Sequence, residues 1–298
     1  MLRFSALLIV PALIVAAPSD SSPFAGRWDF NMPHQHAAWL GIQGSGSDLQ
    51  VWFQPTGGNV FQVKNFKVNG SHLTLQLSPS NTWELDANGD TLTGTAKRGS
   101  NSVPVKGVRA PELKRNPPAA WSEPEPLFNG RDLEGWEPIG NPANSHWKVQ
   151  DGLLVNTEHG DNLRTTRTFT DFKVHYEVNC PEDGNSGFYL RGRYEVQIEY
   201  EPLSNNPPER RIGSIYGRIA PSVELPRKPG EWTAFDVTLV GRTVTVVRDG
   251  TTIIDHKEIE GITGGALDAN EGEPGPFYIQ GDHTGGLKFR NITVAVPK

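Results

Sequence analysis

Short runs in which apolar and polar residues alternate recur along the whole chain, and glycine and proline separate them. Residues 73–77 and 172–178 are clear examples. A period of two is typical of β-strands with one buried face. The 298 residues include 32 glycines and 24 prolines, and no segment shows a convincing helical period. The sequence therefore predicts an all-β protein.

Turn signals separate the predicted strands. Asn69-Gly70, Asn88-Gly89, Asp151-Gly152 and Asp249-Gly250 each stand between two alternating runs. Such dipeptides supply the positive φ that two-residue hairpin loops require. These four sites are therefore predicted to be antiparallel hairpins.

Proline density marks a boundary in the chain. Five prolines fall between residues 111 and 126, which predicts a stiff linker there. Residues 23–110 before it have the short strands of a small antiparallel meander or barrel domain. Residues 127–298 after it have longer strands and no predicted helix. About 170 residues of this kind suit two sheets packed face to face, a β-sandwich or jelly roll.

The first 19 residues have the composition of an export signal. Arg3 precedes an apolar stretch up to Ala17, and small residues suit cleavage after Ala17 or after Ser19. The alternative is a membrane anchor, but about 14 apolar residues interrupted by Pro11 are short of the ~20 that span a bilayer. We therefore expect a periplasmic or extracellular protein whose mature chain has no integral membrane segment. Cys180 is the single cysteine, so no intramolecular disulfide is expected.

Charge and missing motifs narrow the range of partners. The formal net charge is -6, and the isoelectric point of about 5.8 gives no basic field for a phosphate backbone. The sequence has no phosphate-binding loop, no G-x-S-x-G elbow and no paired C-x-x-C. No nucleic-acid partner is expected, and a polar partner that is uncharged or tolerates acidic surroundings fits better.

Residues 194–200 form the most informative predicted strand. Alternation places Tyr194, Val196, Ile198 and Tyr200 on one face and Glu195, Gln197 and Glu199 on the other. The first face belongs to the core. The second is either a solvated outer surface or the floor of a cleft, and composition alone favours the outer surface.

Two carboxylates on this face suggest a glycosidase pair, but the spacing argues against it. Glu195 and Glu199 lie about 13 Å apart on a regular strand at about 3.3 Å per residue. Glycosidase pairs lie about 5 Å or about 6.5 to 9.5 Å apart. A second acid from another strand would be required.

Histidines offer further candidate sites. His283 follows Asp282 in a glycine-rich turn, where the pair could serve a general base or could merely cap backbone groups. His34 and His36 would suit a metal on a strand face, but no third ligand is nearby, and a solvated loop is favoured.

Many ordered blocks in the second half resemble one known family, the 3-keto-disaccharide hydrolase domain family. The resemblance covers about residues 127–297. It rests on the 127–136 block, Trp147 with Asp151-Gly152, the Asn185-Ser186-Gly187 to Arg191 run, Tyr194 to Ile198, the 213–217 block, Pro229 to Trp232, Gln280 with His283, and Phe289 to Ile292.

The resemblance implies a fold and a chemistry. The fold is a concanavalin-like jelly roll whose Arg/Glu/Gln strand lies on the concave side, which reverses the outer-surface interpretation of Glu195 and Gln197. The substrate is an oxidised carbohydrate, a 3-keto-disaccharide or 3-keto-glycoside. A C3 ketone acidifies the C2 hydrogen, so proton abstraction, elimination and hydration can cleave the glycosidic bond. An exported hydrolase of this kind needs one base and a group that stabilises the enolate.

These requirements assign residues. The predicted base is Glu195 or His283, with Arg191 as enolate stabiliser and Asp282 as the residue that orients His283. Gln197, Tyr216 and Gln280 are predicted to contact the sugar. The sequence requires no cofactor and leaves a divalent metal in place of Arg191 open.

Two departures from the family pattern bear on the pocket. Glu199-Tyr200-Glu201 stands where an Asp is expected, and Gly281 lengthens the block between Gln280 and His283 by one residue. Two rival functions stay open. One is a non-catalytic glycan-binding module, since jelly rolls host both functions. The other is an ordinary glycosidase.

Overall fold

The computed structural model describes residues 22–34, 36–200 and 206–298, so the predicted export signal lies outside the described residues. The regular structure of these residues consists of antiparallel strands and three short 3-10 helices, η1 (Gly46–Asp48), η2 (Pro142–Asn144) and η4 (Pro208–Arg210). The all-β prediction is confirmed. In this part of the chain no helix has the length and apolar character needed to cross a membrane.

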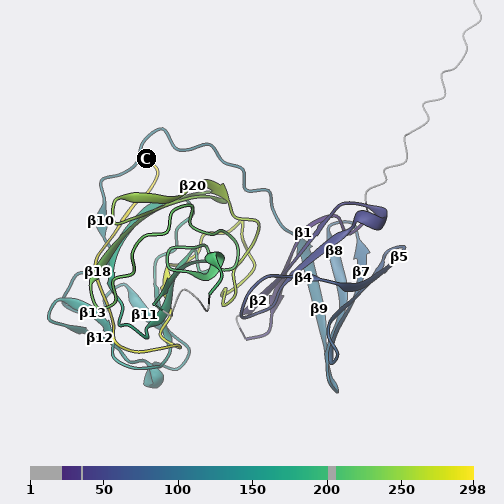
Figure 1. Ribbon diagram of the computed structural model, residues 1–298, viewed down its shortest axis with the longest axis horizontal. Helices are drawn as coiled ribbons and strands as arrows, with labels where there is room; N and C mark the ends of the chain where they lie inside the picture. Colours follow the sequence, from purple (N-terminus) through teal and green to yellow (C-terminus); the bar gives the residue numbers. More distant parts are fainter. Residues whose placement is uncertain (1–21, 35, 201–205) are drawn as a thin grey trace, which may run out of the picture.

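Residues 22–110 form the N-terminal β unit, a single curled sheet (Figure 1). Its strand order is β4-β3-β2-β1-β9-β8-β7-β6-β5. β4 and β5 lie at opposite ends of this order, yet only Lys64 separates them in the chain, so the sheet must curl until its edges approach each other. The strands are β1 (Gly26–Met32), β2 (His36–Gln43), β3 (Gln50–Gln54), β4 (Phe61–Val63), β5 (Asn65–Asn69), β6 (His72–Ser78), β7 (Asn81–Asn88), β8 (Thr91–Arg98) and β9 (Asn101–Arg109).

Aromatic side chains fill the inside of this curled sheet. The rings of Phe30 and Phe53 contact Trp83 edge-on, with centroids 5.3 and 4.9 Å away. Leu40 and Leu73 are fully buried in the same cluster. The alternation in the sequence therefore corresponds to one face of each strand packed inside the unit.

The hairpins form at all four predicted sites, in two different ways. Asp151-Gly152 and Asp249-Gly250 are the loops themselves, with positive φ at both residues, as type I′ turns require. At Asn69-Gly70 and Asn88-Gly89 the asparagine is the last paired residue. The glycine is then the first residue of the loop, one position later than predicted.

The proline-rich segment crosses to the second half of the molecule without regular structure up to residue 120. Trp121 then forms a bridge to Pro297, and β10 (Glu125–Pro126) pairs with β22 (Leu287–Ala295). The end of the predicted linker is therefore a short strand of the following sheet.

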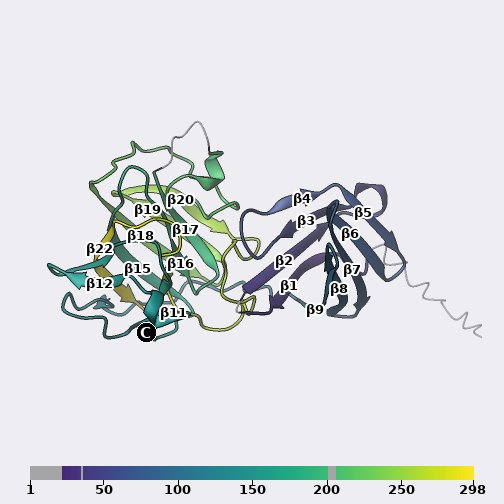
Figure 2. The same cartoon turned by 90° about the horizontal axis from the view of Figure 1, so that it is seen from below.

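Residues 125–297 form the sandwich, in which two sheets pack face to face (Figure 2). The eight-stranded sheet has the order β12-β13-β22-β15-β18-β19-β20, with β10 beside β22, and the five-stranded sheet has the order β11-β14-β21-β16-β17. The remaining strands are β11 (Trp136–Ile139), β12 (Trp147–Gln150), β13 (Leu153–Asn156), β14 (Asn162–Thr165), β15 (Phe172–Asn179), β16 (Asn185–Leu190), β17 (Tyr194–Glu199), β18 (Trp232–Val240), β19 (Thr243–Arg248), β20 (Thr251–Glu258) and β21 (Tyr278–Ile279).

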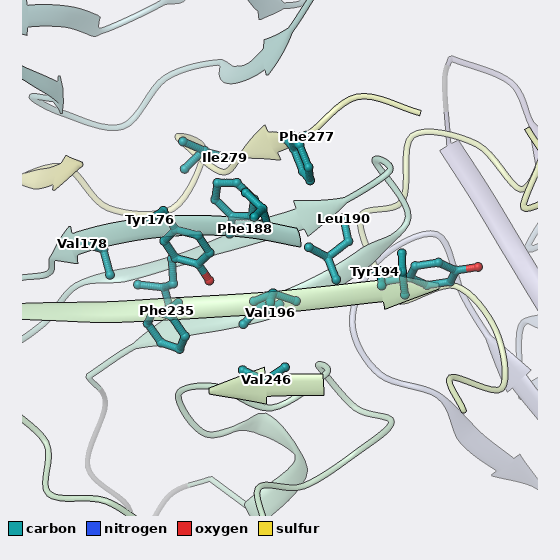
Figure 3. Close-up of a cluster of buried hydrophobic side chains, with 14 of the residues drawn as sticks. Tyr176, Val178, Phe188, Leu190, Tyr194, Val196, Phe235, Val246, Phe277 and Ile279 are labelled. Carbon is teal, nitrogen blue, oxygen red and sulfur yellow. The ribbon is translucent and has the colours of Figure 1, made fainter. Parts of the chain in front are cut away.

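The sandwich core lies between the two sheets (Figure 3). Tyr176 of β15 stacks on Phe188 of β16 at 4.1 Å between ring centroids and on Phe235 of β18 at 5.1 Å. Val196 of β17 points into the same cluster and is fully buried. Because neighbouring residues of a strand point to opposite faces, Glu195 and Gln197 must lie on the other side of the five-stranded sheet.

Candidate active site

Strand register aligns polar side chains in rows across the outer face of the five-stranded sheet. Glu137 pairs with Arg164, Arg164 with Tyr278, Tyr278 with Tyr189, and Tyr189 with Glu195. This row therefore crosses all five strands. A second row two residues further along includes Asn162 on β14, Gln280 after β21 and Gln197 on β17.

These rows form the floor of a cavity of about 800 Å³, a size typical of small-molecule sites. Asp282 and His283 line it from the turn after β21, and Tyr216 from the segment after β17. The rest of the wall includes Gly264, Gly265 and Leu267 and two segments of the N-terminal β unit. Those two segments contribute His34, His36, Thr56, Gly57 and Gly58.

Glu195 is the carboxyl group at the floor of this cavity. Its side chain is only 3% exposed. Burial raises the pKa of Glu195 to about 8. The hydrogen bond shared with Tyr189 opposes this rise, and the nearby charge of Asp282 adds to it. Gly187 on the neighbouring strand leaves room for the carboxyl, since a Cβ there would lie 2.2 Å from Glu195 Oε1.

The hydrogen bonds around Tyr189 fit a protonated Glu195. The Tyr189 hydroxyl lies 2.8 Å from Glu195 Oε2 and 2.7 Å from the carbonyl oxygen of Gly264, but it has only one proton to donate. Both contacts are satisfied when Glu195 donates to Tyr189 and Tyr189 donates to Gly264. Gln280 Nε2 donates to the same hydroxyl at 3.0 Å. At neutral pH the site therefore holds a neutral acid.

Asp282 and His283 form a hydrogen-bonded pair in the same cavity. Asp282 Oδ1 lies 2.8 Å from Nδ1 of His283. Burial favours a higher pKa for Asp282, but its hydrogen bonds with His283 and Asn162 outweigh this and lower the pKa. A carboxylate that holds one imidazole nitrogen orients the ring for proton transfer at the other. The His283 side chain is 42% exposed, so a ligand in the cavity can reach it.

The predicted sugar contacts also line the cavity. Gln197 is 4% exposed, and its Nε2 lies 3.4 Å from Asn185 Oδ1. Its buried Oε1 has no hydrogen-bond partner among the described residues. Tyr216 donates its backbone N–H to the carbonyl of Glu195, which fixes its segment beside β17. An unsatisfied buried acceptor is costly, and a sugar hydroxyl would satisfy it.

Arg191, which was expected to stabilise the enolate, lies away from the cavity. Its side chain is fully buried, and its Nη2 donates to the carbonyl of Gly241 and to the Tyr194 hydroxyl. It is not among the described residues that line the cavity. Arg191 stands in the loop just after β16, with a positive φ of 53°, where strand alternation no longer fixes the direction of a side chain.

Sequence reasoning missed the residues that other strands bring to the floor. Arg164 is the single Arg or Lys among the described cavity-lining residues, and it forms an ion pair with Glu137 at 2.7 Å. Tyr189 lies in the Asn185 to Arg191 run but received no role. Only the strand register shows that both lie on the same face of the sheet as Glu195, with Tyr189 beside it on the neighbouring strand and Arg164 three strands away on β14.

His34 lies in an exposed turn and His36 is exposed at the start of β2, and both side chains line the cavity. Within the described residues, no three His, Cys, Asp or Glu side chains are grouped as a metal centre requires. Glu199 is buried at 1% exposure and does not line the cavity among the described residues. The other carboxyl groups that line the cavity are Glu137 of β11 and Asp282 of the turn after β21.

Comparison with known families decides the classification. Residues 123–295 match the 3-keto-alpha-glucoside-1,2-lyase-like domain, more than half of the chain. The chain belongs to the 3-keto-alpha-glucoside-1,2-lyase-like domain family. This confirms the resemblance to 3-keto-disaccharide hydrolase domains and identifies the sandwich as a carbohydrate-active domain of a glycoside-acting enzyme.

Solved structures from Parabacteroides distasonis ATCC 8503 resemble this family member. One, described as a candidate glycosyl hydrolase, is 28% identical, with a TM-score of 0.50 over 63% of this chain and 94% of its own. A second with the same description is 19% identical, with a TM-score of 0.48 over 56% of this chain and 91% of its own. A comparison with curated proteins gives no match.

Proposed function

We propose that this protein cleaves the glycosidic bond of 3-keto-glycosides by elimination followed by hydration. The observation that carries the proposal is the pairing of a buried neutral acid, Glu195, with the hydrogen-bonded His283 and Asp282 in one cavity. Membership of the 3-keto-alpha-glucoside-1,2-lyase-like domain family supports the same substrate class.

The two groups take complementary roles. Either Glu195 or His283 could serve as the base from their residue types alone, but Glu195 already holds a proton at neutral pH and suits the acid. His283 removes the C2 proton, with Asp282 stabilising the imidazolium that forms. Electrons of the C2–H bond form the C1–C2 double bond as the C1–O bond breaks. Glu195 gives its proton to the departing oxygen, so an unsaturated ketone and a free alcohol result.

Hydration reverses these proton transfers. Water loses a proton to the Glu195 carboxylate and its oxygen bonds to C1, while the imidazolium of His283 returns a proton to C2. The product is a 3-keto sugar, and both residues regain their starting states. The net reaction consumes one water molecule and needs no oxidant or reductant.

The remaining cavity residues bind and polarise the substrate. Arg164 is the guanidinium available to an enolate oxygen, in place of Arg191. The unpartnered Oε1 of Gln197 accepts from a sugar hydroxyl, and Tyr216 and Gln280 complete the polar lining.

The test is incubation with a 3-keto-disaccharide and with its unoxidised parent, followed by NMR of the products. We expect cleavage of the ketone and almost none of the parent, since without the carbonyl the C2 hydrogen is too weak an acid. Equal cleavage of both would indicate an ordinary glycosidase, and binding without cleavage a glycan-binding module. Deuterium at C2 should exchange with solvent during turnover, whereas its retention would indicate direct hydrolysis.

Two variants test whether Arg164 or Arg191 stabilises the enolate oxygen. Arg164→Met should lower turnover by about 10² to 10³, the cost of one oxyanion donor. Arg191→Met should instead lower thermal stability, because it removes the buried donor to Gly241. A folded Arg191→Met variant with the larger loss of turnover would return the role to Arg191.

A further inference from the structure

The N-terminal β unit is packed against the sandwich through a strand that is buried on both faces. Ala38, Leu40 and Ile42 of β2 point into the core of the N-terminal β unit, whereas Ala37 and Trp39 belong to the core cluster of the sandwich. The guanidinium of Arg218 lies 4.2 Å from the Trp39 ring centroid. Figures 1 and 2 both show β2 on the side that faces the sandwich.

The same packing holds one loop of the N-terminal β unit, residues 54–58, at the cavity. Gln54 is fully buried, and its Nε2 donates to the carbonyls of Pro55 and Gly58 at 2.9 Å each. The carbonyl of Thr56 accepts from the backbone N–H of Gly265 at 3.0 Å. The loop is thus fixed from inside its own unit and from the sandwich.

This loop lies close to the acid of the site. A Cβ at Gly264 would lie 2.1 Å from the carbonyl oxygen of Gly58, so the two backbones are in direct contact. Gly264 accepts from Tyr189, and Tyr189 contacts Glu195. Only two residues, Gly264 and Tyr189, therefore separate the 54–58 loop from the group that protonates the departing oxygen.

We propose that the N-terminal β unit supplies the binding subsite for the leaving group, and that it makes the enzyme prefer a second sugar over a small alcohol in that position. This inference rests on the proposed function, in which Glu195 protonates the leaving oxygen. The wall presents polar groups suited to sugar hydroxyls, namely the imidazoles of His34 and His36, the hydroxyl of Thr56 and the backbone of Gly57 and Gly58.

Gly57 offers a clean way to test the subsite in the full chain. A Cβ at Gly57 meets nothing within 4 Å, and its φ lies outside the left-handed region, so a side chain can be added without backbone strain. Gly57→Trp would fill the leaving-group side of the cavity. Val68→Trp is the matched control, because Val68 is 37% exposed on β5 and does not line the cavity.

The assay compares a 3-keto-disaccharide with the corresponding methyl 3-keto-glycoside. We expect Gly57→Trp to raise KM for the disaccharide about tenfold or more and to change kcat/KM for the methyl glycoside less than about threefold. His34→Ala and His36→Ala should each raise the disaccharide KM about three- to tenfold through lost hydrogen bonds. Val68→Trp should leave KM and kcat/KM unchanged for both substrates.

If Gly57→Trp changed the kinetic constants of both substrates equally, or of neither, the proposed leaving-group subsite would be refuted. Failure of the wild-type protein to cleave either substrate would overturn the proposed function instead. In that case calorimetry with the same two 3-keto-glycosides decides the inference. Weaker binding of the disaccharide alone in Gly57→Trp supports it, and any other result, including no binding to the wild type, refutes it.

Discussion

Replacing Glu195 with Gln should remove activity and raise stability, and the gain in stability should grow with pH. The carboxyl binds its proton more tightly in the folded state, where its pKa is about 8 instead of 4.5. As pH rises between these values, ionisation favours the unfolded chain, so the wild type loses stability. The Gln amide keeps the shape of the neutral acid and can donate to Tyr189, but it never ionises.

The magnitude follows from the two pKa values. Each tenfold change in proton affinity is worth about 1.4 kcal/mol, so Gln should gain about 3 kcal/mol at pH 7 and less than about 1 kcal/mol at pH 5. For a chain of this size that corresponds to a Tm increase of about 6 °C at pH 7. Above pH 8 the gain should level off, because the wild-type carboxyl is then ionised in both states.

Thermal unfolding of the wild type and of Glu195→Gln between pH 5 and pH 9 measures the difference in stability. Turnover of a 3-keto-disaccharide measures the predicted loss of activity. Turnover should fall by about 10² to 10⁴ in Glu195→Gln. In the wild type the rate should decline above about pH 8, as the acid loses its proton.

Glu177→Gln is the control of opposite sign. Burial alone would raise the pKa of Glu177, but hydrogen bonds from Asn291 and Arg290 outweigh it and lower the pKa. Its ionised form therefore stabilises the fold above the unfolded pKa, and the variant should lose stability at neutral pH. A Tm difference for Glu195→Gln that is the same at every pH, or full activity in that variant, would refute the reasoning.

Three further changes test other parts of the site. Gly187→Ala should lower turnover about tenfold or more in a folded protein, because its Cβ would displace the Glu195 carboxyl; kcat together with circular dichroism checks this. Asp282→Asn should lower kcat about 10²-fold by removing the charge beside His283, with binding of substrate nearly unchanged in calorimetry. Asp29→Asn should raise Tm at unchanged activity, and the gain should grow as the pH rises from about 4 to about 8, since burial raises the pKa of this carboxyl from 3.8 to about 8. The carboxyl oxygens have no hydrogen-bond partner among the described residues, and a lower Tm in the variant would contradict this prediction.

Local sequence signals were enough for the elements of the fold. Alternation determined which residues of 194–199 enter the core, because side chains of a strand point to opposite faces whatever its neighbours are. The positions of the Asp-Gly loops could be predicted because Asp and Gly tolerate the positive φ values that these loops require. The Asn-Gly loops shifted by one residue because strand pairing, a long-range property, sets which residue is the last in the ladder.

The site needed information that no single strand carries. Six residues were predicted to belong to the site from the sequence and the family resemblance, and all of them line the cavity: Glu195, Gln197, Tyr216, Gln280, Asp282 and His283. Arg164 and Tyr189 join the same cavity floor as Glu195 only through the pairing of strands that lie far apart in the chain. Arg191, which the family resemblance placed in the site, does not line the cavity, because it stands in a loop beyond the end of β16 and its guanidinium is bound to Gly241 and Tyr194.

The N-terminal β unit shows most clearly which features the sequence predicts and which depend on tertiary packing. Its strands were readable from alternation, and residues 37–42 are nearly all apolar, as expected of a strand buried on both faces. Nothing in the sequence indicates what covers the second face. Only tertiary packing decides that the sandwich covers it and that the 54–58 loop meets the cavity, because docking depends on the fit of two complete surfaces.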